Sequence, residues 1–202
     1  MLTVHHLNQS RSKRVLWLLE ELGMAYQRVD HQRDANSRLA PASLKAIHPL
    51  GKAPVIVDGD ITLCESGAVL EYILDQAGDS ALRPARGSAD YYRYLEWSHF
   101  AEGSLALPVI TSLLLTMESR SGTQPLDGYI GKEKQVDFSY IEATLTSRPY
   151  FAGDNFTAAD IMMAVMLEFA ANLGLLADYP HTLAYLKTMQ QRPAYQTAAQ
   201  IG

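Results

Sequence analysis

Residues 47–72 read IHPLGKAPVIVDGDITLCESGAVLEY, and this stretch decides how the first half of the chain folds. Pro54 opens an apolar run typical of a strand, Asp58-Gly59-Asp60 is a strong hairpin signal, and residues 61–64 give the return strand. Glu65-Ser66-Gly67 then begins a helix, because apolar residues follow at helical spacing. The stretch predicts a turn, a β-hairpin and a helix in immediate succession.

The junctions of this stretch carry polar groups that suit one kind of ligand. A residue before a cis-proline can turn its N–H and C=O away from the sheet, and we expect the Ala53-Pro54 bond to be cis. A helix start favours an anion, so Ser66 can bind a carboxylate, while Glu65 can pair with an amine and Lys52 with a second carboxylate. Glutathione, an extended peptide with two carboxylates and one amino group, matches this set.

A purely structural interpretation of the same residues stays open. Pro54 can simply begin an edge strand. Glu65 and Ser66 can simply cap a helix, since acidic and hydroxyl side chains are favoured at helix starts. These residues alone do not decide between a binding site and a structural role, so the decision depends on the remainder of the chain.

The chain before this stretch predicts a strand–helix–strand unit. Residues 2–6 alternate as in a strand, residues 11–22 carry apolar side chains at helical spacing, and residues 26–30 give a second strand. Two strands joined through a helix pair in parallel. With a short helix at 42–46, the element order is βαβ-α-ββα, that of a thioredoxin-like α/β domain, which we assign to residues 1–78.

The second half of the chain predicts an all-α domain. Residues 79–87 read as a linker, and the domain takes up residues 88–202. Thr157 and Asp160 form a capping-box pattern before an almost wholly apolar stretch, which predicts a central helix. The other helices are expected at 89–117 with a kink at Pro108, at 132–146, at 180–191 and at 193–200.

Composition excludes several classes of protein. The chain has 202 residues and a formal net charge of −5, which argues against a nucleic-acid surface. Its start lacks the pattern of a signal peptide, and no apolar run is expected to span a membrane. The single cysteine, Cys64, cannot form an intrachain disulfide and fits the cytoplasm. The six histidines show no metal-binding spacing, so no metal is expected.

Several motifs recur in one family in this order. The first domain carries LNQSRSKRVLWLLEELG and HPLGKAPVIVDGDITLCESGAVLEYI, and the second carries AEGSLALP and FAGDNFTAADIMM. The chain resembles the glutathione transferase superfamily from end to end, and RDANSRLAP, LKAIHPLG and AEGSL look most like its fungal and bacterial Gtt-type branch. The resemblance implies a cytoplasmic homodimeric enzyme that uses glutathione as co-substrate. It implies that Ala53, Glu65 and Ser66 bind glutathione, with Lys52 helping, beside the cis bond expected at Pro54. Arg38 is a further candidate that could assist Lys52 with the glycyl carboxylate.

Serine-type branches of this family place a hydroxyl at the start of the first helix, where it donates to the glutathione sulfur. That position falls on Ser10. A free thiol with a pKa of about 8.5 is mostly protonated at pH 7, and lowering that pKa by about two units needs roughly 2.7 kcal/mol. One hydrogen bond to a charged group supplies roughly 1.5–3 kcal/mol. Asn8 is the second candidate and Ser12 the third, because branches differ in the loop residue they use.

Two further predictions concern the surroundings of this site. The loop contains no cysteine, and Cys64 is expected to be a small core residue. This weakens a role in thiol–disulfide exchange. The family's electrophile pocket lies beside the helix expected at 89–117, and its candidate lining residues are His99, Glu102 and Leu105.

The leading hypothesis is a detoxifying glutathione S-transferase that adds the glutathione thiolate to small electrophiles. A glutathione-dependent peroxidase or disulfide reductase on the same site is an alternative. A third possibility is a non-enzymatic glutathione-binding or regulatory module, which the intact Glu65-Ser66 pair disfavours.

Overall fold

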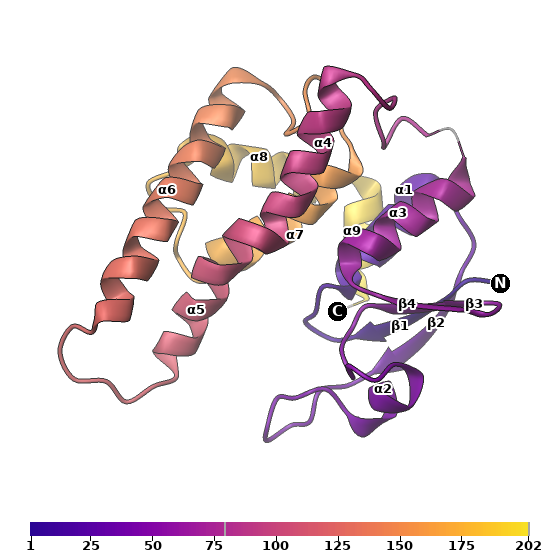
Figure 1. Ribbon diagram of the computed structural model, residues 1–202, viewed down its shortest axis with the longest axis horizontal. Coiled ribbons are helices and arrows are strands. Elements are labelled where there is room, and N and C mark those ends of the chain that lie inside the picture. The colour runs from indigo at the N-terminus through magenta and orange to yellow at the C-terminus, as the bar shows by residue number, and fades with distance from the viewer. Residues whose placement is uncertain (79, 202) are drawn as a thin grey trace. The chain divides into compact units, whose positions relative to one another are not determined.

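The computed structural model describes residues 1–78 and 80–201 and divides into two compact units (Figure 1). The first unit comprises Met1–Ser80 together with Gln190–Gly202, and the second comprises Ala81–Met189. Two predicted positions, Asp79 in the linker and Gly202 at the end of the helical domain, lie outside the described residues.

The first unit is built on a four-stranded sheet with the strand order β2-β1-β3-β4. Strands β1 and β2 are parallel, whereas β3 is antiparallel to both β1 and β4. This topology confirms the predicted thioredoxin-like βαβ-α-ββα fold. Its elements are β1 Thr3–Leu7, α1 Ser12–Leu22, β2 Gln27–His31, α2 Ala42–Ile47, β3 Val55–Asp58, β4 Ile61–Cys64, α3 Ser66–Ala77 and, from the end of the chain, α9 Pro193–Gln200.

Local signals explain where these elements end. Helix α1 ends at Gly23, whose φ of 61° lies in the left-handed region that glycine adopts without a steric penalty. In the β3–β4 hairpin, Asp58 pairs with Ile61, and the loop begins at Gly59 with a φ of 57°. Strands β1 and β2 each lie one residue later in the chain than predicted, because their pairing begins with Thr3 opposite Gln27.

The second unit is helical, as predicted. It contains α4 Ala89–Phe100, the π-helical turn η1 Ala101–Leu105, α5 Ala106–Thr116, α6 Pro125–Ser147, α7 Ala158–Asn172 and α8 Pro180–Gln190. The expected single helix at 89–117 is therefore interrupted by η1. Pro108 has no N–H to donate to the carbonyl of Ser104, which lies four residues earlier and inside η1. A regular α-helix would lack this hydrogen bond as well, so the irregular turn does not cost it.

The predicted start of the helix at 132–146 is wrong, because α6 already begins at Pro125. The Gln124 side chain accepts from the backbone of Asp127, and the Asp127 carboxylate accepts from the Gln124 N–H at 2.7 Å. This is a capping box, with proline in the first helical position, where its missing N–H has no intrahelical partner to lose. Both signals are present in the sequence.

Helix α9 belongs to the first unit, whereas the sequence placed it in the helical domain 88–202. The Arg192 guanidinium, next to α9, donates to both carboxylate oxygens of Glu21 in α1, at 2.6 and 2.9 Å. Tyr195 packs edge-on against the buried Trp17, with ring centroids 5.0 Å apart. These contacts join α9 to α1 through side chains far apart in the sequence.

Residues 89–116 form a helical run that is long and apolar enough to cross a membrane by length and composition alone, which the sequence analysis did not expect. One side of this run is buried: Trp97 packs against Phe151 with ring centroids 4.5 Å apart and stacks on Tyr140 at 4.9 Å. Core helices also meet that length and composition criterion.

Asp160 organises the second unit. Its fully buried carboxylate accepts from the N–H groups of Phe151 and Thr157 at 3.0 and 2.8 Å, from the Thr157 hydroxyl at 3.0 Å and from the Tyr185 hydroxyl at 2.8 Å. The predicted capping box of Thr157 and Asp160 is confirmed. The same carboxylate therefore fixes the start of α7, the preceding loop and α8.

Asp160→Asn should destabilise the protein by roughly 2–4 kcal/mol, because an amide cannot accept from every donor that now faces a carboxylate oxygen. Urea unfolding followed by far-ultraviolet circular dichroism measures this loss. Asp178→Asn, an exposed change of the same kind, should leave the unfolding midpoint in place. Equal midpoints for the two variants would contradict the role assigned to Asp160.

Candidate functional site

The site is centred on the two ends of the β3–β4 hairpin. The Ala53-Pro54 peptide bond is cis, as the sequence predicted. The strand pairing of β3 begins at Val55, so Ala53 lies outside the sheet ladder. At the other end, β4 ends at Cys64, and Glu65 and Ser66 lead directly into α3. The hairpin thus brings the predicted residues on either side of it into one region.

Glu65 lies on an unusual backbone. Its φ of 72° is in a region that side-chain-bearing residues rarely adopt, at a cost of order 1–3 kcal/mol. Its side chain is exposed, and its carboxylate makes no hydrogen bond or ion pair with any residue in the described part of the chain. A glycine would relieve this backbone cost, and the exposed carboxylate can pair with a group outside the chain, such as an amine.

Ser66 is buried, and its hydroxyl accepts a hydrogen bond of 2.9 Å from a guanidinium nitrogen of Arg14. Because the hydroxyl accepts from arginine, its own proton is left to donate. The free N–H groups at the start of α3 and the buried positive charge of Arg14 favour a negatively charged group here. These groups together suit a carboxylate.

Arg14 was not among the predicted site residues. It is fully buried in α1 among Val15, Leu18 and other apolar side chains. An arginine is almost never fully buried without partners. Its place directly before Val15 and four residues before Leu18, both apolar, was the signal in the sequence that could have identified it.

The loop between β1 and α1 holds the three candidates for the thiol-contacting residue. Ser12 is fully buried. The Asn8 side-chain oxygen already accepts from the Arg33 N–H at 2.8 Å. Ser10 is half-buried, and its Oγ lies 2.7 Å from the Ser12 Oγ. Ser10 is thus the only one of the three that combines a hydroxyl with a partly accessible position, which favours the predicted order of the candidates.

A second residue missing from the sequence-based predictions holds this loop in place. The Arg33 guanidinium donates to the carbonyl oxygens of Asn8 and Gln9, each at 3.2 Å, and to that of Arg38 at 3.0 Å. Arg38, a predicted glutathione ligand, has a φ of 60° and donates to the Gln9 side chain. Lys52 is exposed. Nothing in the local sequence predicts the contacts of Arg33 with Asn8 and Gln9, because these partners lie 25 and 24 residues away.

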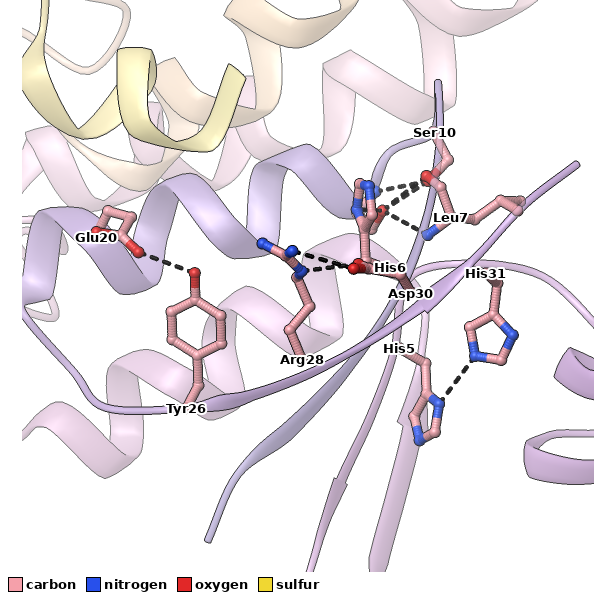
Figure 2. Close-up of polar contacts among 10 residues, drawn as sticks. His5, His6, Leu7, Ser10, Glu20, Tyr26, Arg28, Asp30 and His31 are labelled. Atoms are coloured by element: carbon pink, nitrogen blue, oxygen red, sulfur yellow. Dashed lines mark hydrogen bonds and ion pairs between the residues drawn. The ribbon is translucent and has the colours of Figure 1, made fainter. Parts of the chain in front are cut away.

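Two histidines next to the site have structural partners. His5 Nδ1 lies 3.1 Å from His31 Nε2 (Figure 2). His31 Nδ1 lies 2.9 Å from the Ser43 hydroxyl, so these contacts join β1, β2 and α2. Burial lowers the pKa of both rings, which favours the neutral form. Within residues 1–78 and 80–201, no three His, Cys, Asp or Glu side chains gather as a metal ion would need.

The predicted pocket residues occupy different environments within the second unit. His99 in α4 is exposed, Glu102 in η1 is half-buried, and Leu105 is fully buried. Their assignment to an electrophile pocket stays a prediction. Cys64 is buried at the end of β4, as expected of a core residue.

Comparison with known proteins identifies the family. Residues 1–75 match the model of the glutathione S-transferase N-terminal domain, and residues 108–193 match that of the C-terminal domain. Glutathione S-transferase 3 of Schizosaccharomyces pombe is 34% identical, over 99% of this chain and 87% of its own length. The chain belongs to the glutathione S-transferase family. The transferase function predicted from the sequence is confirmed at this level.

Other relatives agree with the predicted branch and fold. Glutathione S-transferase 1 of Saccharomyces cerevisiae is 30% identical over 96% of this chain and 92% of its own. A glutathione S-transferase structure from Actinobacillus pleuropneumoniae has a TM-score of 0.90 at 32% identity, covering 99% of this chain and 92% of its own. A sphingomonad glutathione S-transferase, solved in complex with glutathione, has a TM-score of 0.78 at 27% identity and covers 98% of both chains.

Proposed function

We propose that this enzyme joins the sulfur of glutathione to small electrophilic molecules, and that the first unit binds the glutathione. The observation that carries the proposal is the junction at the start of α3. There an exposed Glu65 on a strained backbone adjoins a buried Ser66 that accepts from a buried arginine. An acid for an amine beside a cationic site for a carboxylate matches the α-amino acid end of glutathione.

The remaining groups extend this match along the tripeptide. Ala53 offers its main-chain N–H and C=O beside Pro54, outside the sheet ladder, which suits an extended peptide. Lys52 and Arg38 are exposed cations that suit the glycyl carboxylate. Family membership supports glutathione as the ligand, as does the sphingomonad relative solved with glutathione.

Ser10 is the group we assign to the sulfur. A hydroxyl that donates to a thiolate stabilises it by roughly 1.5–3 kcal/mol, which lowers the thiol pKa by roughly one to two units. The thiolate then attacks the electrophilic carbon, a sulfur–carbon bond forms, and the displaced group leaves with its electron pair. His99, Glu102 and Leu105 stay as the proposed lining of the electrophile pocket.

We also propose that the enzyme is a cytoplasmic homodimer. Helices α5 and α6 carry several large apolar side chains that are between 43 and 55% exposed. Single exposed apolar residues are common on protein surfaces, whereas a group of them suggests an interaction surface. A second copy of the chain would cover such a surface. Those exposed side chains are Leu107, Leu114, Leu126, Tyr129, Val136 and Tyr140.

Glu65→Gln should weaken glutathione binding at least tenfold, because the neutral amide no longer pairs with the α-amino group. Calorimetric titration of the folded variant measures the affinity. Asp60→Asn, at another exposed acid in the hairpin loop, is the matched control and should bind as the wild type does. Unchanged affinity in Glu65→Gln would refute the site.

Ser10→Ala should raise the pKa of bound glutathione by roughly one to two units, since a hydrogen bond to the thiolate is lost. The ultraviolet absorbance of the thiolate, followed through a pH titration of the binary complex, measures this pKa. The affinity for the neutral thiol should hardly change. If Asn8→Ala moves the titration and Ser10→Ala leaves it in place, the activating residue is Asn8.

The dimer should be visible by equilibrium sedimentation at micromolar concentration as a mass near twice the 22.4 kDa of the chain. Val136→Glu should shift the population toward monomer, because it places a charge on the apolar surface. A wild-type mass that stays near that of one chain across the concentration range would contradict the homodimer.

A further inference from the structure

A short chain of hydrogen bonds leads from β1 to the thiol-activating loop. His6 Nδ1 lies 2.8 Å from the Ser12 Oγ, and the Ser12 Oγ lies 2.7 Å from the Ser10 Oγ. Figure 2 shows the His6 ring and the Ser10 side chain converging beside Leu7 at the end of the strand. His6 is 2% exposed and Ser12 is fully buried, so the chain of contacts starts in the core and ends at the partly accessible Ser10.

The Ser12 hydroxyl has only one proton, and the distances limit where it goes. Its contacts with the N–H and C=O of Leu7 are both 3.3 Å, longer than strong hydrogen bonds. The contacts with His6 and Ser10 are short, so each of them contains a donated proton. Because both contacts are shorter than the 3.3 Å contact with the Leu7 carbonyl, we place the Ser12 proton in one of them, so that Ser12 donates to one of these two residues and accepts from the other.

Two directions of donation satisfy these contacts. In the outward direction, His6 Nδ1–H donates to Ser12, and Ser12 donates to Ser10. In the inward direction, Ser10 donates to Ser12, and Ser12 donates to an unprotonated His6 Nδ1. The Ser12 N–H also donates to the Ser10 Oγ, at 3.2 Å. In the outward direction the Ser10 oxygen thus accepts twice from Ser12, and its own proton is left for an external acceptor.

A bound thiolate selects between the two directions. A hydrogen bond to an anion contributes more than one between neutral groups, roughly 1.5–3 against 0.5–1.5 kcal/mol. Only the outward direction gives Ser10 a proton for the sulfur. Each donor in a chain also becomes stronger when its own oxygen accepts a hydrogen bond.

We propose that His6 and Ser12 are positioning residues that direct the Ser10 hydroxyl at the glutathione sulfur, with the His6 proton on Nδ1. This inference rests on the proposed function, because it takes Ser10 as the residue that contacts the sulfur. His6 and Ser12 touch no substrate and act through Ser10 alone. The tautomer of one core histidine therefore sets which way the activating hydroxyl donates.

The tautomer can be read directly in the unmodified enzyme. Long-range ¹H–¹⁵N correlation spectra of the complex with saturating glutathione, at a pH where the bound thiol is ionised, distinguish protonated from unprotonated ring nitrogens. His6→Asn identifies the His6 signals by their loss. We expect a protonated Nδ1. An unprotonated Nδ1 in the saturated complex would overturn the outward direction and the proposal.

Ser12→Ala tests the same chain by function. Loss of its hydroxyl should raise the pKa of bound glutathione, so that the thiolate fraction at pH values below that pKa falls roughly three- to tenfold. In a Ser10→Ala background, Ser12→Ala should add nothing, because the two residues act as one unit. Ser43→Ala removes a Ser–His contact of the same kind, the one with His31, and should leave the pKa in place.

The outcomes separate the two proposals. If Ser10→Ala raises the thiol pKa and Ser12→Ala does not, the positioning role is wrong and the proposed function stands. Equal rises from Ser12→Ala with and without Ser10 also contradict positioning. If Ser10→Ala itself leaves the pKa unchanged, the assigned role of Ser10 fails, and the positioning role fails with it. His6→Asn, whose amide N–H replaces Nδ1–H, should raise the pKa of bound glutathione less than His6→Leu does. The reverse order would count against the proposal.

Discussion

The hydrogen bond from Arg14 to Ser66 is the interaction on which the candidate site depends. It joins the first turn of α1 to the first turn of α3, two helices that pack against each other. The positive end of the α3 dipole and a buried guanidinium then act on the same small region. A charge buried at this depth costs several kcal/mol unless it is well paired, and the hydrogen bond with Ser66 is one of the contacts that offset this cost.

The backbone around the site shows the same compromise. In the described part of the chain, the non-glycine residues with positive φ are Gln9, Arg38 and Glu65. Gln9 adjoins the proposed catalytic serine, and the other two are proposed glutathione ligands. Arg33 binds the carbonyl oxygens of Gln9 and Arg38, and so offsets part of the cost of two of these conformations. Unfavourable backbone geometry is thus concentrated where ligand contacts are proposed.

Features governed by neighbouring residues could be predicted from the sequence. The hairpin at Gly59, the helix starts at Ser66 and Thr157, and the parallel pair of β1 and β2 all follow local rules. The start of α6 was missed although Gln124, Pro125 and Asp127 carry its signal, because a weakly apolar first turn did not stand out.

The polar contacts of the site were largely beyond sequence reasoning. Arg14 meets Ser66 across 52 residues, and Arg33 meets Asn8 across 25. The contact of His6 with Ser12 spans only six residues, but it depends on where β1 ends and how the loop turns. A hydroxyl or imidazole has many possible partners, and only the tertiary arrangement selects one. This is why Ser10 could be named from a motif while the residues that orient it could not.

The end of the chain completes the unit that carries the site. Trp17 is fully buried and is covered by Tyr195, and its indole N–H donates to Glu21 at 2.8 Å, the same carboxylate that pairs with Arg192. Lys13 donates to the Tyr195 hydroxyl at 2.9 Å and lies over the same ring. Without α9, the outer face of α1 would lose the cover of Trp17 and the partner of Glu21. Because α1 begins next to Ser10 and contains Arg14, α9 supports the helix that carries part of the candidate site.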